Sequence, residues 1–539
     1  MPKFATNAAL EKAIVGHADE DTPRLAYADW LDENGDPDRA AFIRVQCRLA
    51  DLSPAAPDWV DLREQELELV ARLKSRLGEL ANLGREADNF YFGHDFIGHH
   101  EEPFRRGFPY FIDSQTSGDD WTDRERARVV RELTRYLTTT TVRGVSFSET
   151  PLDTMRQLLA EPVAEKLTGF ACFADQADSF AEFFRFVGTA PALQNVKHMF
   201  LYGGFDPLPA AELANATAFD SVRRITIQNI EGTRADLERL VRAPWFRRLQ
   251  HFRCFIDRVP DARVLAAGLG ELPDLHTLDV PAFPDGAVSA LAKAEFPALA
   301  RLMYSGPIEA KFAKTLAKAK FPALTAFELH RGRAKNDGLA ELLSADWFAQ
   351  LRVLHMAENG IGDKGAKALA AHPVARSLRV LKFGDNTFGK AGLAALGTFP
   401  ALTTLDLRSY HARKATSADL AAWLAGLALP NLRHLDLHNW PLGDAGAKAL
   451  AANPAFATLT RLSLEECDIG DAGAKALFAS PHLQNLVELH LSSNRIKTGA
   501  DALASKGVMP RLGACWLAGN KITEKAAEKF ERPGLYLIS

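Results

Sequence analysis

The chain repeats one short pattern fifteen times between Val142 and Leu512: an apolar residue, two variable residues, an apolar residue, a variable residue and a final apolar residue. Successive copies begin 24 to 30 residues apart. A fixed period of this length indicates a solenoid of stacked repeats, because such repeats share one continuous core. We number each copy from its first residue, so positions one, four and six are apolar. The copies begin at Val142, Leu167, Val196, Val222, Leu249, Leu275, Leu299, Leu324, Leu351, Leu378, Leu402, Leu432, Leu459, Leu486 and Leu512.

The pattern predicts a strand in each repeat, and the segment that follows predicts a helix. The clearest helical segments are rich in small residues, as in Gly365 to Ala370. Strands of a parallel ladder lie about 4.8 Å apart, whereas packed helices need about 8 to 10 Å. The strands must therefore line the inside of an arc and the helices its outside. We expect an α/β horseshoe solenoid with a parallel sheet on the concave face and with the apolar positions pointing away from the hollow.

Three segments carry a family resemblance: 359–369, 442–450 and 469–477. They resemble the ribonuclease-inhibitor-like class of leucine-rich repeats, strongly over 324–522 and weakly over 142–323. In this resemblance an asparagine, or Cys467 in one copy, satisfies backbone groups of the turn after the strand, and an aspartate caps the helix. The resemblance implies protein–protein recognition.

The region before the repeats predicts a small all-α module over residues 1–52. The run from Pro23 to Pro37, continued by Arg39, Ala40, Phe42, Ile43, Arg44 and Gln46, resembles the bacterial repeat-companion domain. That family brings no established activity, so the resemblance implies no catalytic residue. Arg24, Asp29, Asp36 and Arg44 are candidates for ion pairs that fix the helix angles, and a docking site for a partner is the alternative role of the module.

Residues 53–112 predict a long helix, from Pro57 to about Leu83, and an aromatic junction. Six phenylalanines and two tyrosines occur between Phe90 and Phe111. We expect this junction to cap the exposed end of the repeat stack, because terminal repeats need covering; an aromatic ligand pocket is the alternative. The third segment, 113–539, is the leucine-rich-repeat solenoid, with about 15 repeats that are degenerate before residue 324.

The charge balance is close to neutral, with 64 basic against 68 acidic side chains. The imbalance is local, because residues 1–85 carry 11 basic and 16 acidic side chains. This distribution argues against a nucleic-acid or membrane binder. The start of the chain shows no secretory signal pattern, and the five cysteines are far apart with no CxxC pair. We therefore expect a cytoplasmic protein with reduced thiols. Three of them (Cys172, Cys254 and Cys515) fall on apolar strand positions that point into the core.

Positions five and seven of each repeat are expected to point into the hollow, because side chains alternate along a strand. The early repeats place aromatic residues there: Phe173, Phe200, Tyr202 and Phe255. The later repeats place mixed polar residues there: Glu328, His330, His355, Lys382, Asp406, Arg408, Asp436, His438, Glu465, His490 and Trp516. Both groups are candidate binding residues. The alternatives are that the aromatic rings belong to the core in a shifted register, and that the charged residues are ordinary solvated pairs.

Recognised catalytic and phosphate-binding motifs are absent from the sequence, which has no GxxxxGK[ST] loop, no HExxH helix and no GxSxG elbow. One corner invites a chemical hypothesis, because adjacent strands should place Asp406 beside Asp436. Two close carboxylates favour a bound cation or a raised carboxyl pKa, with His438 as a further ligand or base. Arg408 offers the alternative of a neutralised surface network.

The sequence thus favours a non-catalytic interaction scaffold that binds an unknown protein partner on its concave face, without cofactor or metal. A metal-assisted or hydrolytic enzyme at the Asp406, Asp436 and His438 corner is the first alternative, and a regulator of a small GTPase is the second. Residues 535–537 fall where a sixteenth strand would begin. We therefore expect a monomer, or a weak dimer formed through an open sheet edge there.

Overall fold

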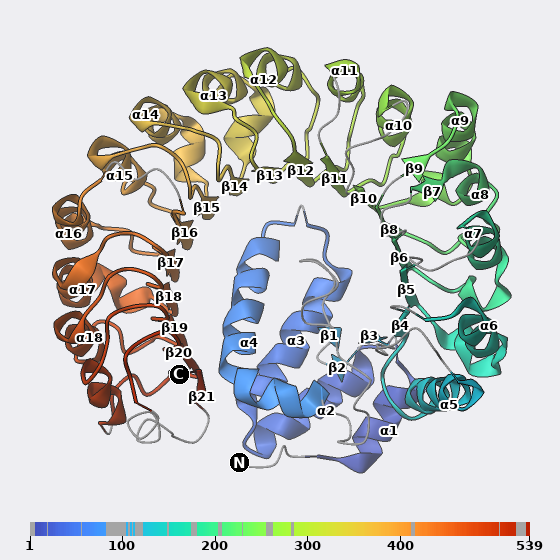
Figure 1. Cartoon of the computed structure of the whole chain (residues 1–539), viewed down its shortest axis with the longest axis horizontal. Coiled ribbons are helices and arrows are strands. Elements are labelled where there is room, and N and C mark those ends of the chain that lie inside the picture. The colour runs from blue at the N-terminus through green and yellow to red at the C-terminus, as the bar shows by residue number, and fades with distance from the viewer. Residues whose placement is uncertain are drawn as a thin grey trace.

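The computed structural model describes residues 6–18, 20–54, 56–81, 104–105, 108–109, 111–113, 122–147, 150–173, 180–202, 207–228, 230–254, 262–281, 285–410, 415–505, 507–523 and 535–538. Within them the chain forms an N-terminal group of helices followed by a curved solenoid (Figure 1). Most of the predicted aromatic junction lies outside the described residues.

The solenoid is built on a continuous parallel ladder that follows the inside of the arc (Figure 1). Its strands are β3 (Phe111–Asp113), β4 (Gly144–Phe147), β5 (Gly169–Phe173), β6 (His198–Tyr202), β8 (Arg224–Ile227), β10 (His251–Cys254), β11 (Thr277–Pro281), β12 (Arg301–Ser305), β13 (Ala326–Leu329), β14 (Val353–His355), β15 (Val380–Lys382), β16 (Thr404–Asp406), β17 (His434–Asp436), β18 (Arg461–Ser463), β19 (Glu488–His490), β20 (Ala514–Trp516) and β21 (Tyr536–Ile538). The predicted sixteenth strand is present as β21. Two short pairs stand apart, β1 (Phe104–Arg105) with β2 (Phe108–Pro109) and β7 (Leu208–Pro209) with β9 (Ile230–Glu231).

The register of this ladder places the same repeat position side by side in every strand. Position four, for example, pairs Phe327 with Leu354, Leu354 with Leu381 and Leu381 with Leu405. These residues and those at positions one and six are buried in one continuous core behind the sheet. The predicted horseshoe, with its leucines directed away from the hollow, is therefore confirmed. The weak early repeats keep the same register, as Phe170 beside Met199 shows.

Helices cover the convex side of the sheet (Figure 1). They are α5 (Asp123–Thr139), α6 (Leu152–Ala160), α7 (Phe180–Thr189), α8 (Ala210–Ala214), α9 (Arg234–Arg242), α10 (Ala262–Leu269), α11 (Asp285–Lys293), α12 (Ala310–Leu316), α13 (Lys335–Leu343), α14 (Asp363–Ala371), α15 (Lys390–Leu396), α16 (Ser417–Gly426), α17 (Gly443–Ala452) and α18 (Asp471–Phe478). Short 3-10 helices follow several of them: η1 (Pro162–Lys166), η2 (Pro191–Leu193), η3 (Phe246–Arg248), η4 (Asp346–Gln350), η5 (Pro373–Arg376), η6 (Pro454–Thr458) and η7 (Gly499–Ala504).

The asparagine after the strand forms hydrogen bonds with the backbone groups of the turn, as expected. Asn494 Oδ1 accepts hydrogen bonds from the amides of Cys467 and Ile469, and its Nδ2 donates to the carbonyls of Leu464 and Leu491. In the previous repeat Cys467 takes this place, with its Sγ 3.0 Å from the carbonyl of Leu437. Since all these groups are buried, each one satisfied avoids a cost of about 1 to 3 kcal/mol.

The aspartate of the repeat caps a helix, but the helix belongs to the next repeat. Asp444 Oδ1 accepts from the amides of Gly470 and Gly473 at the start of α18, at 2.7 and 2.9 Å. The glycine is needed for this approach, because a Cβ at Gly473 would lie 2.7 Å from that oxygen. The cap is therefore a link between neighbouring repeats.

The N-terminal module consists of α1 (Ala8–Gly16), α2 (Thr22–Glu33), α3 (Pro37–Asp51) and α4 (Trp59–Ala81), which agrees with the predicted helices. Leu62, Leu69 and Leu73 of α4 pack on Phe42 and Val45 of α3. Arg44 forms the expected ion pair with Asp29 and a further one with Asp32, at 2.7 Å each. Arg24 donates to backbone carbonyls, among them that of Glu20 at 2.6 Å.

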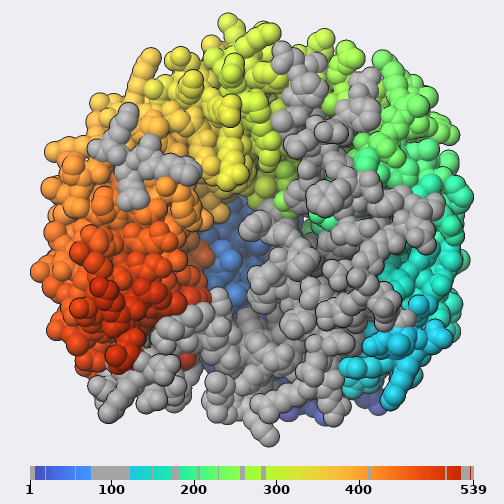
Figure 2. Space-filling model, in the orientation of Figure 1, coloured from blue at the N-terminus to red at the C-terminus, as the bar shows by residue number. Residues whose placement is uncertain are grey.

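The module lies inside the arc of the solenoid (Figure 1). In the space-filling view its blue atoms are visible in the opening between the two arms (Figure 2). The concave face, which the sequence analysis treated as a free surface, is therefore partly covered by the chain's own first helices.

Candidate functional site

Helix α4 docks on the concave face through residues at position two of successive repeats. This column of position-two residues, hereafter the second-position column, comprises Thr325, Arg352, Arg379, Thr403, Arg433, Thr460, Val487 and Gly513. The column follows the turn before α4 and then α4 itself in chain order. At one end the hydroxyl of Thr325 lies 3.4 Å from the carbonyl of Pro54. At the other end, a Cβ added to Gly513 would lie 2.9 Å from the carbonyl of Ala71. The turn before α4 thus meets the repeats of β13 and β14, and α4 itself runs along the arc from β15 to β20.

Charge complementarity holds this contact. Asp61 forms an ion pair with Arg379, and Glu68 forms one with Arg433 at 3.0 Å. Glu68 also accepts a hydrogen bond from the hydroxyl of Thr460 at 3.0 Å. Arg352 donates to the carbonyl of Pro57 at 2.9 Å. The acidic excess of the first 85 residues is therefore matched, along α4, by basic and hydroxyl side chains of the solenoid.

Glu64 lies at the centre of this interface and is buried. Its Oε1 accepts hydrogen bonds from the hydroxyls of Thr403 and Thr404, the latter at 2.9 Å. Burial raises the pKa of Glu64, and these hydroxyls together with Arg461 and Arg379 oppose that rise only in part. The carboxylate is consequently less stable in its ionised form here than in water.

A second contact joins the module to the opposite arm of the solenoid. Arg143, at position two of the first repeat, is buried, and its Nη2 donates to the carbonyl of Val15 in α1 at 3.0 Å. The module therefore spans the hollow, with α1 against the first repeat and α4 against the later ones (Figure 1).

The predicted early aromatic residues are not an open patch where the structure describes them. Phe200 points away from the solenoid core, between core residues Met199 and Leu201, yet it is only 6% exposed. Its ring stacks on Tyr202 with the centroids 6.4 Å apart. Phe173 belongs to β5, but its side chain is outside the described residues, as is Phe255 altogether. The register is as predicted, so the shifted-register alternative is wrong for Phe200.

The corner around Asp406 is a network closed by an arginine. Asp406 and Asp436 are paired in register on β16 and β17. Arg408 binds Asp406 through Nε and Nη2, and the same Nη2 lies 3.5 Å from Asp436 Oδ2. His438 turns its Nδ1 toward Glu465, at 3.5 Å, rather than toward either carboxylate. The geometry favours the neutralised network over a metal or hydrolytic site.

Burial and the nearby Asp406 raise the pKa of Asp436, while Arg408 lowers it. The side chain of Asp406 raises the pKa of Arg408 above its usual value, so the guanidinium stays charged. A permanent cation thus occupies the place between the two carboxylates that a metal ion would need.

Another predicted set of residues converges between β13 and β14. Glu328 and His355 are direct register partners, and His330 follows Glu328 by two residues. Although burial opposes ionisation, Arg301 and the two histidines hold the pKa of Glu328 well below its usual value. Burial, only partly offset by Glu328, lowers the pKa of His355. An ionised carboxylate therefore lies beside an imidazole that favours its neutral form.

The remaining predicted residues lie along the later part of the ladder, from β15 to β20. His490 stacks on Trp516 with ring centroids 3.9 Å apart and shares a hydrogen bond with Glu488 at 2.9 Å. Tyr410, which sequence reasoning did not select, lies 4.9 Å from the His438 ring and is 51% exposed. Lys382 is the register partner of both His355 and Asp406.

The predicted concave face consists of positions five and seven and leaves out the second-position column. A signal was present on both sides. Asp61, Glu64 and Glu68 are spaced as one face of a helix, and arginine or threonine recurs at position two of six consecutive repeats from Thr325 to Thr460.

One family of repeats matches several segments of the solenoid. The family described as "Leucine Rich repeat" matches residues 350–370, 374–397, 428–451, 457–478 and 482–504. Among curated proteins no match is found. None of the helices in the described residues is long and apolar enough to cross a membrane.

Solved structures give distant matches. The Rad7 and Elc1 complex of yeast matches with 15% identity over 77% of this chain and 87% of that chain, with a TM-score of 0.37. An internalin of Listeria monocytogenes matches with 16% identity over 68% and 93%, with a TM-score of 0.36. A leucine-rich-repeat protein of Leptospira interrogans matches with 15% identity over 77% and 98%, with a TM-score of 0.34. The repeat segments and the observed architecture together establish a leucine-rich-repeat solenoid that encloses its own N-terminal helical module.

Proposed function

We propose that this chain is a non-catalytic scaffold that binds a protein partner on the part of its concave face that α4 leaves open. Leucine-rich-repeat proteins generally mediate protein–protein interactions, and the match to that repeat family supports the class. We further propose that residues 1–52 are a repeat-companion domain and that the repeats belong to the ribonuclease-inhibitor-like class.

The proposed binding surface is the carboxyl-edge patch, which we define as Arg408, Tyr410, His438, Glu465, His490 and Trp516. Contact with α4 is made at positions two and three, whereas the patch begins at position five and continues past position seven. At about 3.3 Å per residue, positions three and seven lie roughly 13 Å apart along a strand. The docked helix and a partner can therefore share the concave face.

The single observation that carries the proposal is the composition of this patch. Tyr410 is 51% exposed, and the side chain of Arg408 is 43% exposed although it is anchored by Asp406. Tyrosine, tryptophan and arginine are the residues most often responsible for binding energy at protein interfaces. Arg408 is anchored by Asp406, and Trp516 belongs to β20 and stacks on His490, so both side chains lose little conformational freedom on binding.

The test is a comparison of variants in affinity purification from the native cell. Tyr410→Ala combined with Trp516→Ala should weaken capture of the co-eluting partner by about tenfold or more, since each is expected to contribute about 1 kcal/mol or more. Lys367→Ala combined with Lys448→Ala, on helices α14 and α17 of the convex side, is the matched control. Thermal unfolding of both variants shows whether the fold is kept.

Full capture by the Tyr410 and Trp516 variant, together with loss of capture by the convex control, would contradict the proposal. That result would move the partner to the outside of the arc.

A further inference from the structure

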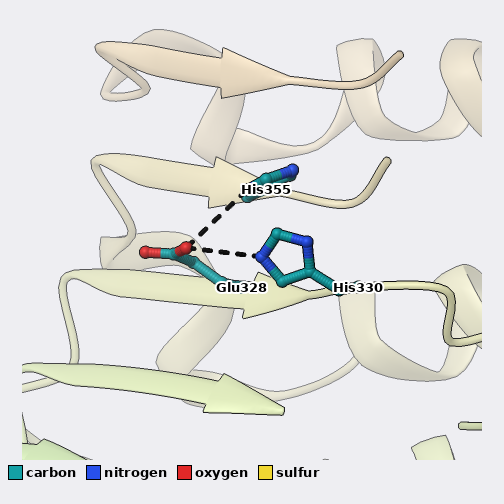
Figure 3. A group of neighbouring side chains, drawn as sticks. All are labelled: Glu328, His330 and His355. Carbon is teal, nitrogen blue, oxygen red and sulfur yellow. Dashed lines mark ion pairs between the residues drawn. The ribbon is translucent and has the colours of Figure 1, made fainter. Parts of the chain in front are cut away.

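Glu328, His330 and His355 bring three side chains of types that ligate metals close together on the concave sheet (Figure 3). Glu328 and His330 point to the same side because they are two residues apart on β13 and its extension. His355 comes from the neighbouring strand β14, directly opposite Glu328 in the register. One ligand atom from each residue lies within 4.8 Å of the other two.

We propose that these three residues bind a divalent transition-metal ion of borderline softness, for which Zn²⁺ is the representative.

Two of the three distances between ligand atoms are close to those around a bound ion, and the third, between the two histidines, is within 4.8 Å. Glu328 Oε2 is 3.7 Å from His330 Nε2 and 3.7 Å from His355 Nδ1. Zinc–nitrogen bonds of about 2.0 to 2.1 Å in a tetrahedral site place neighbouring ligand atoms about 3.3 Å apart. The contraction required at the carboxylate is thus small. Rotation of the His330 side chain, which is 38% exposed, can supply most of the movement.

The ligand set selects the class of ion. Two imidazole nitrogens and one carboxylate oxygen suit zinc and its neighbours in the first transition row. Calcium and magnesium prefer oxygen ligands and usually bind more than three of them. Three protein ligands leave a fourth coordination position for water or another donor.

An outer residue orients the carboxylate. Arg301 Nη2 lies 2.5 Å from Glu328 Oε1, so one oxygen is held by the arginine while the other faces the histidines. Hydrogen bonds of this kind fix ligands in known metal sites. Arg301 leaves one oxygen of Glu328 available for a metal ion. At the Asp406 corner, by contrast, Arg408 binds a carboxylate of Asp406 and also lies near the carboxylate of Asp436.

The chain offers a matched control at His490. It occupies position five of its repeat, as His355 does, and it also lies beside a carboxylate, with His490 Nε2 2.9 Å from Glu488 Oε1. Its neighbour on the next strand is Trp516 rather than a second histidine. His490→Ala therefore removes an imidazole–carboxylate pair without touching the proposed site.

The experiment uses the full-length, tag-free chain after removal of metals by a chelator. Equilibrium dialysis against Zn²⁺ should give one tightly bound ion per chain in the wild type and in His490→Ala. Loss of a residue that only hydrogen-bonds to a metal ligand lowers the metal affinity about 10- to 100-fold. His330→Ala and His355→Ala each remove a ligand, so their affinity for Zn²⁺ should fall by more than that. Co²⁺ in place of Zn²⁺ should give the visible absorption of a four-coordinate site, and this band should be lost in both variants.

Thermal unfolding keeps the test independent of folding defects. Without metal the variants should unfold close to the wild type. Added Zn²⁺ should raise the Tm of the wild type and of His490→Ala by mass action, but not the Tm of His330→Ala or His355→Ala. Equal Zn²⁺ binding by the wild type and both histidine variants would overturn the proposal, as would the absence of a tight ion in the wild type.

Discussion

Glu64 shows at the scale of one residue how the module is held and what that contact costs. Its carboxylate is enclosed between α4 and the sheet, where two threonine hydroxyls bind it and no cation is in direct contact among the described side chains. Burial is the largest influence on its pKa, and the net effect is an increase. The folded chain therefore holds the Glu64 proton more strongly than the unfolded chain does.

The sign of the pH dependence follows from this difference. The unfolded state ionises Glu64 near the usual glutamate pKa of 4.5, and the folded state ionises it at higher pH. Stability contributed by Glu64 is therefore fully present below pH 4.5 and is lost as the pH rises through the folded pKa. Glu64→Gln removes this loss while its amide oxygen still accepts from the hydroxyls.

We predict that Glu64→Gln raises the Tm relative to the wild type at neutral pH and that the difference vanishes in acid. Calorimetric scans of both proteins over a series of pH values measure it. Asp61→Asn is the control, because Asp61 is half exposed and forms an ion pair with Arg379; it should instead lower the Tm at neutral pH. A Tm difference for Glu64→Gln that stays constant with pH would contradict the assignment.

At the scale of the elements, the repeat period alone predicted the strands, their register and the core. This was possible because a shift of one residue in the register of a strand would point all its leucines into the hollow, so the apolar pattern allows only one register. The helix of each repeat was also predictable, but the direction of its cap was not. Asp363 reaches forward to the amides of Gly389 and Gly392, as Asp444 reaches to α18, and a cap between repeats has the same sequence as a cap within one.

The forward cap gives a prediction about coupling between repeats. Asp444→Ala leaves the first amides of α18 without their acceptor and should destabilise the chain by about 0.5 to 2 kcal/mol. Asp444→Asn keeps an acceptor and should recover most of this loss. Native-state hydrogen exchange should report the change first in the amides of α18, at Gly470 and Gly473, rather than in α17.

Protection that falls only within α17, the helix to which Asp444 itself belongs, would show that the aspartate acts inside its own repeat. Lys448→Ala, on the same helix, is the control for a general effect of substitution.

At the scale of the whole molecule, the module inside the hollow could not be read from the sequence. The ion pairs that hold α4 join residues more than 300 positions apart, such as Asp61 with Arg379 and Glu68 with Arg433. Threonine and arginine at position two are equally typical of a solvated sheet surface. The candidate site was predictable in its later polar residues, whose strand positions follow from the period, but the covering of Phe200 and the exposure of Tyr410 depend on packing that no local pattern encodes.

The most direct test of this arrangement is zero-length coupling of a carboxylate to an amine across the interface. Arg379→Lys places an amine beside Asp61 of α4, and carbodiimide should then join the peptide that contains Asp61 to the peptide that contains position 379. Adding Asp61→Asn should remove that link. Recovery of the cross-linked peptide by mass spectrometry is the result we predict; its absence from a folded Arg379→Lys chain, with α4 linked only to other parts of the module, would contradict the docking of the module in the hollow.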